Sequence, residues 1–409
     1  MRPHFVPRAA SKALERTLRT LPVAVISGAR QTGKSYLAEH APSLRGHTLL
    51  TLDDLDTREH AAARPADFVR QAPRLIVDEV QRVPELLLAI KQAVDEQGHG
   101  QPGRFVLTGS ANLLLMRQVG ESLAGRAGYV TVYPMTRRER RGEGTTAAWT
   151  RLFETPFEEW AGLISASDAP QGHWRDEARI GGFPRPALQL DATEREVWFR
   201  NYEATYLERD LRDLRAVGNL GEFRRFMRAL ALRIGGPVNV SDVARELGLE
   251  ARTLRRWLDD LEVSYQVVRI EAYTRRRTAR LRRRPKLYWV DPALALRVAG
   301  EHEPRGEHLE ALILADLLPW AALDEGRAQV LYWRDEANRE VDFVLERGGK
   351  LIAVEVKATE RPRMDDWKHL EHFTTQHGRD CSGALLLHGG TEVFRAGERI
   401  LAAPWWKVL

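Results

Sequence analysis

The sequence predicts a multidomain α/β protein, and three regions with different patterns support this fold class. Residues 1–215 alternate short apolar stretches with helical stretches, as the strand–helix units of a parallel sheet do. Residues 216–298 contain short amphipathic helices followed by an arginine-rich strand pair. Residues 299–409 begin with an apolar helix and continue into a hairpin and further strands, which predicts another α/β unit.

The composition is ordinary for a globular protein of several domains. The chain has 409 residues, of which 43% are hydrophobic and 29% charged. It contains no apolar run long enough to span a membrane and no apolar signal-peptide core near its first residue. Cys381 is the single cysteine, so no internal disulfide and no cysteine-rich zinc site can form. We therefore expect a cytoplasmic protein without a membrane partner.

The basic residues are unevenly placed along the chain. The net charge is only +5, but the segment from Arg275 to Lys286 contains eight basic residues and no acidic one. A local cluster of this kind favours contact with phosphate groups.

A phosphate-binding loop is the most specific motif in the sequence. Residues 23–40 read VAVISGARQTGKSYLAEH, an apolar strand, then G-x-x-x-x-G-K-S, then a helix. Gly28 and Gly33 would let backbone N–H groups close around the phosphates of ATP. Lys34 would reach the β- and γ-phosphates, and the Ser35 hydroxyl would bind Mg²⁺.

Two further strands would complete this nucleotide site. Residues 74–81 read RLIVDEVQ, so Asp78 and Glu79 follow a buried strand. Asp78 would hold Mg²⁺, and Glu79 would orient and deprotonate the attacking water. Residues 104–112 read RFVLTGSAN, and we expect Ser110 to contact the γ-phosphate or the water. The alternative is an ordinary exit from strand to turn. The polar side chains that follow this strand are Thr108, Ser110 and Asn112.

Several segments together resemble a widespread prokaryotic AAA+-type P-loop ATPase family, the AAA_14/DUF4143-type ATP-binding proteins. The segments are 51–69, 74–95, 105–136, 181–188, 202–214, 284–295 and the hairpin at 339–359. The resemblance covers most of the chain, with a gap near 137–175. It implies an ATPase domain with a helical lid, over residues 1–215, that uses ATP and Mg²⁺.

ATPases of this family work as rings, so the resemblance implies a homo-oligomer, for which a hexamer is one arrangement. In such rings an arginine of one subunit offsets negative charge at the neighbour's γ-phosphate. Arg126 and Arg209 are the predicted arginines. The alternative for each is a structural salt bridge, and Glu208 and Asp210 flank Arg209.

A helix-turn-helix is predicted within residues 239–273. Ser241 would cap the first helix, and Gly248 would form the turn. The second helix would point its arginines outward into a DNA groove. These arginines are Arg252, Arg255 and Arg256.

A strand at 265–271 and a return strand at 286–290 would add a wing, which makes residues 216–298 a winged helix-turn-helix. We expect its arginines to bind the DNA backbone with strong salt dependence and weak sequence specificity. The alternative is a domain for protein contacts whose charges are only solvated. The wing arginines are Arg275, Arg276, Arg277, Arg280, Arg282, Arg283 and Arg284.

The hairpin at 339–359 carries charged residues inside otherwise apolar strands. Asp342 lies near the start of the first strand, and Glu355 and Lys357 lie near the end of the second. Because side chains alternate along a strand, Glu355 and Lys357 point to the same face.

This pattern resembles the PD-(D/E)xK core of restriction enzymes and Holliday-junction resolvases, so residues 299–409 would form a restriction-endonuclease-like α/β domain. The resemblance implies that Asp342, Glu355 and Glu310 hold Mg²⁺ or Mn²⁺ and that Lys357 acts on the attacking water. Val341 stands where the family commonly has proline. The alternative is a platform that holds DNA without cutting it.

Taken together, the sequence predicts a DNA-binding AAA+ ATPase that remodels DNA or moves along it, with a nuclease-like domain. The order of ATPase and winged helix is similar to that of the bacterial Holliday-junction branch-migration motor, so branched DNA is an expected substrate. The alternatives are an ATP-dependent DNA-binding switch and a defence ATPase with nuclease activity.

Overall fold

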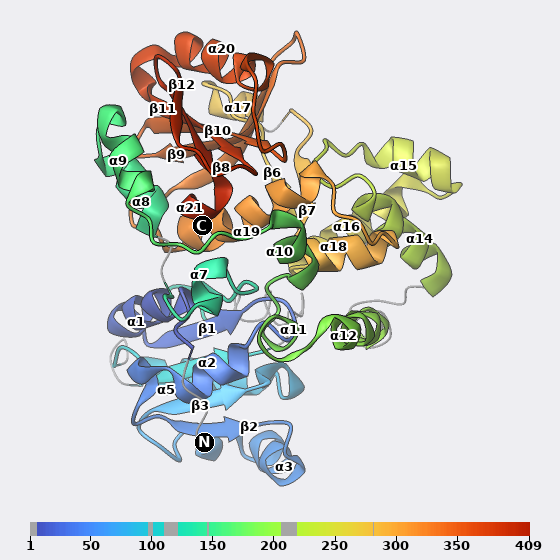
Figure 1. Cartoon of the computed structure of the whole chain (residues 1–409). Coiled ribbons are helices and arrows are strands. Elements are labelled where there is room, and N and C mark those ends of the chain that lie inside the picture. Colours follow the sequence, from blue (N-terminus) through green and yellow to red (C-terminus); the bar gives the residue numbers. More distant parts are fainter. Residues whose placement is uncertain (1–5, 97–100, 110–121, 145–146, 206–218, 281) are drawn as a thin grey trace.

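The computed structural model describes residues 6–96, 101–109, 122–144, 147–205, 219–280 and 282–409. Figure 1 shows an N-terminal sheet and a C-terminal sheet, with a group of helices beside and between them. Among the described residues, no helix is long and apolar enough to cross a membrane.

The N-terminal sheet has five parallel strands in the order β2-β3-β4-β1-β5. β1 is buried along its whole length, because both faces of this sheet are covered by helices. Successive side chains alternate between two cores, so Val25 lies in one core and Ile26 in the other. This confirms the parallel α/β architecture predicted for this part. The strands are β1 Val23–Ser27, β2 Thr48–Thr51, β3 Leu75–Asp78, β4 Phe105–Thr108 and β5 Ala127–Thr131.

Helices α1 and α2 contribute to the core on one face of this sheet, and α3, α4 and α5 contribute to the core on the other. The helices are α1 Ala10–Thr20, α2 Lys34–His40, α3 Leu55–Ala63, α4 Pro65–Phe68 and α5 Leu86–Asp95.

The helices that follow β5 do not all stay with the N-terminal sheet. Trp149 of α8 donates a hydrogen bond from Nε1 to Asp316 Oδ2 at 2.7 Å, and Asp316 belongs to the C-terminal part. Figure 1 likewise shows α8 and α9 beside the C-terminal sheet. The predicted unit 1–215 is therefore divided between two parts of the molecule. The helices are α7 Arg137–Arg140, α8 Ala147–Glu154, α9 Trp160–Ser165, α10 Trp174–Ile180, α11 Pro184–Gln189 and α12 Ala192–Thr205.

Residues 219–299 contain two helices joined by a tight turn and then an antiparallel strand pair, β6 and β7. Gly248 ends α15 with φ of 69°. Asn239, not Ser241, caps α15, because the Asn239 side chain accepts a hydrogen bond from Ser241 N at 3.1 Å. The elements are α14 Leu220–Ala231, α15 Val240–Leu247, α16 Ala251–Val263, β6 Val267–Ile270, α17 Arg277–Arg280, β7 Lys286–Trp289 and α18 Pro292–Ala299.

The C-terminal sheet has six strands in the order β12-β13-β11-β10-β9-β8. β8, β9 and β10 run antiparallel, and β11 and β13 continue parallel to β10. α19 packs on one face of this sheet and α20 on the other. The elements are α19 Gly306–Leu323, β8 Gln329–Arg334, β9 Glu340–Arg347, β10 Lys350–Lys357, α20 Lys368–His377, β11 Cys381–His388, β12 Phe394–Gly397, β13 Ile400–Pro404 and α21 Trp405–Val408.

A single hydrophobic core joins the regions that the sequence pattern separated at residues 298 and 299. Its buried side chains extend from Trp149 to Leu409 and include residues of α14, α16, α18 and α19. Helix α18 is buried on nearly every side, because it lies between α14 and α19. The two predicted units therefore form one packed body in this structure.

Candidate functional site

The predicted phosphate loop joins β1 to α2 at the carboxyl end of the parallel sheet. Gly28 has φ of 136°, and a Cβ there would lie 2.3 Å from Val132 O. Gly33 has φ of 94° and precedes the first residue of α2. Thr32 Oγ1 donates to Ala29 O at 2.9 Å and closes the loop. Both motif glycines are thus required by the backbone path.

Lys34, Ser35 and Asp78 come together at this loop, as predicted. Lys34 is buried, and its Nζ donates to Gly28 O at 3.0 Å and to Ala29 O at 2.8 Å. Ser35 Oγ donates to Asp78 Oδ1 at 3.1 Å. The hydroxyl and the carboxylate are neighbouring oxygen groups, and Mg²⁺ prefers oxygen ligands, so these residues fit that ion.

Two threonines surround the Asp78 carboxylate. Thr108, at the end of β4, donates a hydrogen bond to Asp78 Oδ1, and Thr51, at the end of β2, lies 3.5 Å from Oδ2. Sequence reasoning did not single out Thr51. It does end a strand at the same sheet edge as Asp78, which is where ligands bind in open α/β sheets.

Glu79 follows Asp78 with φ of 58° and ψ of 41°, a left-handed conformation that is uncommon for a residue other than glycine. Its carboxylate accepts a hydrogen bond from Gln81 Nε2. Backbone strain of this kind concentrates at functional sites, so the conformation agrees with the role predicted for Glu79.

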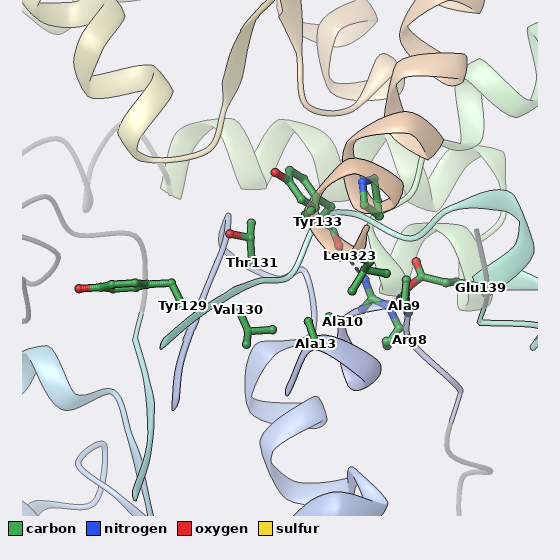
Figure 2. Close-up of a pocket in the computed structure, with 12 residues that line it drawn as sticks. Arg8, Ala9, Ala10, Ala13, Tyr129, Val130, Thr131, Tyr133, Glu139 and Leu323 are labelled. Carbon is green, nitrogen blue, oxygen red and sulfur yellow. Dashed lines mark hydrogen bonds and ion pairs between the residues drawn. The ribbon is translucent and has the colours of Figure 1, made fainter. Parts of the chain in front are cut away.

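Arg8 holds the phosphate loop from outside the motif. Its Nη1 donates to Thr32 O at 2.7 Å and its Nη2 to Tyr133 O at 2.6 Å. Its Nε lies 3.1 Å from Glu139 Oε1. Figure 2 shows Arg8 and Glu139 beside a small cavity of about 80 Å³. No sequence signal marked Arg8, because its partners are mostly backbone oxygens distant in the chain.

Tyr265 links the helix-turn-helix region to the nucleotide site. It follows α16 with φ of 57°, and its hydroxyl donates to Ser27 Oγ at 3.0 Å. Ser27 is the last residue of β1 and directly precedes Gly28. The segment that directly follows α16 is therefore bonded to the residue that directly precedes the phosphate loop.

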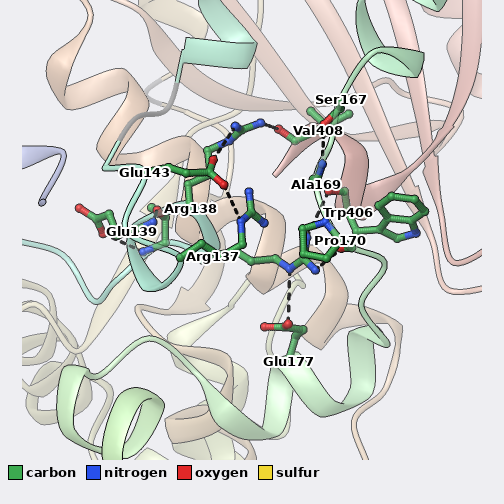
Figure 3. A network of polar contacts seen from close by, with 12 residues as sticks. Arg137, Arg138, Glu139, Glu143, Ser167, Ala169, Pro170, Glu177, Trp406 and Val408 are labelled. Carbon is green, nitrogen blue, oxygen red and sulfur yellow. Dashed lines mark hydrogen bonds and ion pairs between the residues drawn. The ribbon is translucent and has the colours of Figure 1, made fainter. Parts of the chain in front are cut away.

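A network of arginines after β5 connects the N-terminal sheet to the end of the chain (Figure 3). Arg137 Nε lies 3.4 Å from Glu177 Oε1, and Arg137 Nη1 donates to Trp406 O at 3.3 Å. Arg138 Nη2 donates to Val408 O at 3.1 Å. Through these hydrogen bonds α7, which follows the N-terminal sheet, contacts the backbone of α21.

Asp291, at the start of α18, makes a second connection between distant segments of the chain. Its Oδ1 accepts from Leu294 N at 2.9 Å, and its Oδ2 accepts from Gly182 N at 2.6 Å. Gly182 O in turn accepts from Met135 N at 2.6 Å. The segments 181–188 and 284–295, which carry the family resemblance, thus meet at this junction.

The predicted arginine finger at Arg126 has a partner in its own chain. Arg126 Nε lies 2.6 Å from Asp95 Oδ1, and its Nη1 donates to Ala124 O at 3.1 Å. Within one chain Arg126 thus forms a salt bridge, and its role at a neighbour's γ-phosphate stays a prediction. Arg209 and Ser110 lie outside the described residues.

The predicted nuclease-like residues come together between α19 and the C-terminal sheet. Asp342 Oδ2 accepts a hydrogen bond from Val356 N at 3.0 Å. Lys357 Nζ lies 2.7 Å from Glu355 Oε1, as expected for two residues on the same face of β10. Glu310 Oε2 accepts from the Tyr288 hydroxyl at 2.7 Å.

Burial controls the charge of this cluster. Burial, and then the negative charge of Asp342, raise the pKa of Glu310 and that of Glu355 to about 8. The pKa of Tyr288 is also raised, first by burial and then by Glu310. Burial thus favours the protonated form of each glutamate, whereas the nearby ammonium group of Lys286 favours the ionised form.

Lys286, which the sequence analysis counted among the basic residues that lead into the return strand, lies inside this cluster. Its Nζ is 2.6 Å from Glu340 Oε1 and 3.2 Å from Asp342 Oδ1. The described part of the chain contains no group of three or more histidine, cysteine, aspartate or glutamate residues arranged to hold a metal ion. A cation, the ammonium group of Lys286, thus already lies beside the carboxylates for which Mg²⁺ or Mn²⁺ was predicted. The sequence does contain one sign of this position: Lys286 begins an otherwise apolar strand. A charged side chain that points into a core needs groups of opposite charge around it.

Most of the predicted DNA-binding arginines are exposed, but the prediction is wrong for Arg280, which is buried. Arg280 is buried, and its Nη2 lies 2.8 Å from Glu346 Oε2, so it ties α17 to the C-terminal sheet instead. The side chain of Arg277 lies outside the described set. The exposed arginines are Arg252, Arg255, Arg256, Arg275, Arg276, Arg282, Arg283 and Arg284.

Comparison with protein families divides the chain into three matched parts. Residues 21–140 match a family model described as an AAA domain. The N-terminal part therefore resembles AAA-type P-loop ATPase domains. Residues 171–305 match a domain of unknown function, DUF8612, which spans the boundary that the sequence pattern placed near residue 216. Residues 305–408 match a second such domain, DUF4143.

Relatives in sequence cover nearly the whole chain. An uncharacterized protein of Mycobacterium tuberculosis is 27% identical over 424 residues, covering 98% of this chain and 84% of its own. An uncharacterized protein of Haemophilus influenzae is 20% identical over 361 residues and covers 82% of each chain.

Solved structures with partial similarity include a Walker-type ATPase of Pyrococcus abyssi, at 18% identity and a TM-score of 0.44. That match covers 73% of this chain and 97% of the other. A RuvB variant from Thermotoga maritima is 20% identical, with a TM-score of 0.27, and the match covers 67% of this chain and 91% of that one.

Proposed function

We propose that the protein is a DNA-binding ATPase that couples ATP hydrolysis to remodelling of DNA or movement along it. The observation that carries the ATPase assignment is the grouping of Lys34, Ser35 and Asp78 at the carboxyl edge of a parallel sheet. Lys34 and Ser35 come from the start of α2 and Asp78 from the end of β3, and together they present a cation and two oxygen groups beside the phosphate loop.

Each residue of this site has a distinct task in hydrolysis. Lys34 would bind the β- and γ-phosphates, and the backbone N–H groups of the loop would surround them. Ser35 and Asp78 would hold Mg²⁺, which, when bound, would neutralise charge on the phosphate oxygens. Glu79 would orient the attacking water and accept its proton.

The exposed arginines support the DNA-binding half of the proposal. Arg252, Arg255 and Arg256 lie on α16, the second helix of the helix-turn-helix, and further exposed arginines lie between β6 and β7. Such a surface would contact phosphates and depend strongly on salt. We further propose that the protein acts as a homo-oligomeric ring, such as a hexamer, on branched DNA such as a Holliday junction.

A second function is an ATP-dependent switch that binds DNA without moving it. The hydrogen bond from Tyr265 to Ser27 favours this alternative, because it would let the nucleotide state reach α16 directly. A switch would hydrolyse ATP slowly and at a rate insensitive to DNA.

Steady-state ATP hydrolysis by variants tests the site. We expect Lys34→Ala to abolish turnover, because the phosphates lose their cation, while Glu79→Gln should bind a fluorescent ATP analogue yet turn over at least about 100-fold more slowly. Lys12→Ala, on the same domain but outside the loop, is the control. Normal turnover in Lys34→Ala would refute the site assignment, and rapid turnover in Glu79→Gln would show that another residue is the base.

A further inference from the structure

We propose that Lys286 is the resident cation of the nuclease-like centre and takes the place that a divalent metal would occupy. The centre then works as a clamp between β7 and the C-terminal sheet, and it does not bind Mg²⁺ or Mn²⁺. This inference is independent of the ATPase proposal, because it concerns a different site and a different ion.

The Lys286 side chain is only 1% exposed, and three carboxylates converge on its ammonium group. Nζ lies 2.6 Å from Glu340 Oε1, 3.2 Å from Asp342 Oδ1 and 3.9 Å from Glu310 Oε2. Two of these residues belong to β9 and one to α19. Nζ also lies 5.7 Å from the ring centroid of Tyr332, which favours a cation there.

A divalent ion and this ammonium group would compete for the same oxygens. Mg²⁺ needs its ligand oxygens at about 2.1 Å and Ca²⁺ at about 2.3–2.6 Å, so an ion held by Asp342 and Glu310 would lie against Nζ. Two positive charges a few ångström apart inside a protein repel each other strongly. Occupancy by Lys286 therefore excludes the metal that the resemblance implies.

Glu355 has a buried carboxyl oxygen close to Lys286 that could bind a metal ion if Lys286 were removed. Its Oε1 is paired with Lys357 at 2.7 Å, whereas its Oε2 is buried and has no hydrogen-bond partner among the described residues. Without Lys286, three carboxylates would lose their cation beside this free oxygen. An excess of buried carboxylates is an environment in which a divalent ion binds.

The clamp has a consequence for the helix-turn-helix region. Lys286 is the first residue of β7, and the neighbouring Arg280 pairs with Glu346 of β9 at 2.8 Å. The Tyr332 hydroxyl of β8 also donates to Arg284 O. The segment between β6 and β7 is thus fixed to the C-terminal sheet by charges, and DNA bound there would be held by both parts.

Electron paramagnetic resonance of Mn²⁺ tests this proposal on the nucleotide-free, full-length protein. The comparison uses the wild type, Asp342→Asn, Lys286→Ala and the double variant. We expect the wild type and Asp342→Asn to bind Mn²⁺ equally, because the clamp leaves no site there. Lys286→Ala should bind one additional Mn²⁺ per chain, which the double variant should lose.

Two results would overturn the proposal. One is Mn²⁺ binding by the wild type that Asp342→Asn removes. The other is a Lys286→Ala protein that keeps its native circular dichroism spectrum but binds no additional Mn²⁺. If Lys286→Ala does not fold, Lys286→Met, which keeps the side-chain length, replaces it, and the comparison of wild type with Asp342→Asn still decides whether the native centre takes a metal.

Discussion

At the scale of single residues, buried charges show how the parts of this molecule depend on one another. Asp316 of α19 accepts a hydrogen bond from Trp149 of α8 at 2.7 Å through Oδ2, and its Oδ1 has no hydrogen-bond partner among the described residues. Burial raises the pKa of Asp316 to about 6, against an ordinary value of 3.8. The carboxyl group of Asp316 therefore keeps its proton to a higher pH in the folded protein than in the unfolded chain.

This shift predicts a pH dependence of stability with a defined sign. The pKa of Asp316 is higher in the folded protein than in the unfolded chain, so protonation of Asp316 stabilises the fold. This contribution is full below about pH 4 and is lost as the pH rises through about 6. Asp316→Asn keeps an oxygen for Trp149 but cannot ionise. We expect it to raise the free energy of unfolding at pH 7 by on the order of 2 kcal/mol.

Urea unfolding at about pH 5 and pH 7 measures this effect, with the exposed Asp365→Asn as the control. A gain at pH 7 that shrinks at pH 5 is the expected pattern. An Asp316→Asn protein less stable than wild type at pH 7 would contradict the account.

At the scale of elements, the turn between α10 and α11 holds the junction between the N-terminal sheet and the helices. Gly181 has φ of 69°, and a Cβ there would lie 2.6 Å from Asp291 Oδ1. Both the backbone conformation and the close carboxylate therefore exclude a side chain at Gly181.

Gly181→Ala should destabilise the protein by about 2–4 kcal/mol, since its backbone conformation, with φ of 69° and ψ of -165°, is almost restricted to glycine and costs about 1–3 kcal/mol, and the collision adds a further penalty. Gly348→Ala is a matched control, because Gly348 has φ of 57° but no atom within 4 Å of the added Cβ. Denaturant unfolding of both variants separates the two costs. Equal losses in the two variants would show that the contact with Asp291 is unimportant.

Helix α16 is the element on which the DNA proposal depends most. We expect Arg252→Ser, Arg255→Ser and Arg256→Ser together to weaken duplex binding for all sequences alike. The slope of log K against log salt should fall by up to about 2.7, at about 0.9 for each lost phosphate contact. Fluorescence anisotropy at several salt concentrations measures this slope.

The control for the triple α16 variant replaces three exposed arginines of the N-terminal domain by serine, so it loses the same positive charge. These arginines are Arg19, Arg45 and Arg74. An equal loss of affinity in this control would assign the effect to net charge alone. An unchanged isotherm in the α16 variant would instead favour a protein-contact role for the helix-turn-helix.

At the scale of the whole molecule, contacts between distant segments connect the nucleotide site to the rest of the chain. Tyr265 reaches Ser27, Arg8 reaches Thr32, and Arg137 reaches the backbone of Trp406. The region from Trp149 to Leu409 shares one core. The phosphate loop is thus bonded through Tyr265 to the segment after α16, which belongs to this packed body.

The sequence predicted the features that local rules determine. The glycine spacing and the apolar strand located the phosphate loop, and strand alternation placed Glu355 beside Lys357. It did not predict Arg8, Tyr265 or the position of Lys286, because their partners lie far away in the chain and no periodicity records them. The packing of α18 and α19 across the predicted domain boundary was not predicted either, because both helices are apolar on several sides and join regions that look separate in sequence.

The measurement that tests the central claim most directly is ATP hydrolysis by the full-length protein with and without DNA, using duplex and four-way-junction substrates. Lys34→Ala provides the background rate. We expect hydrolysis that depends on Lys34 and becomes faster when DNA is bound. Hydrolysis at the background rate, or a rate that does not change with DNA that the protein demonstrably binds, would contradict a DNA-coupled ATPase.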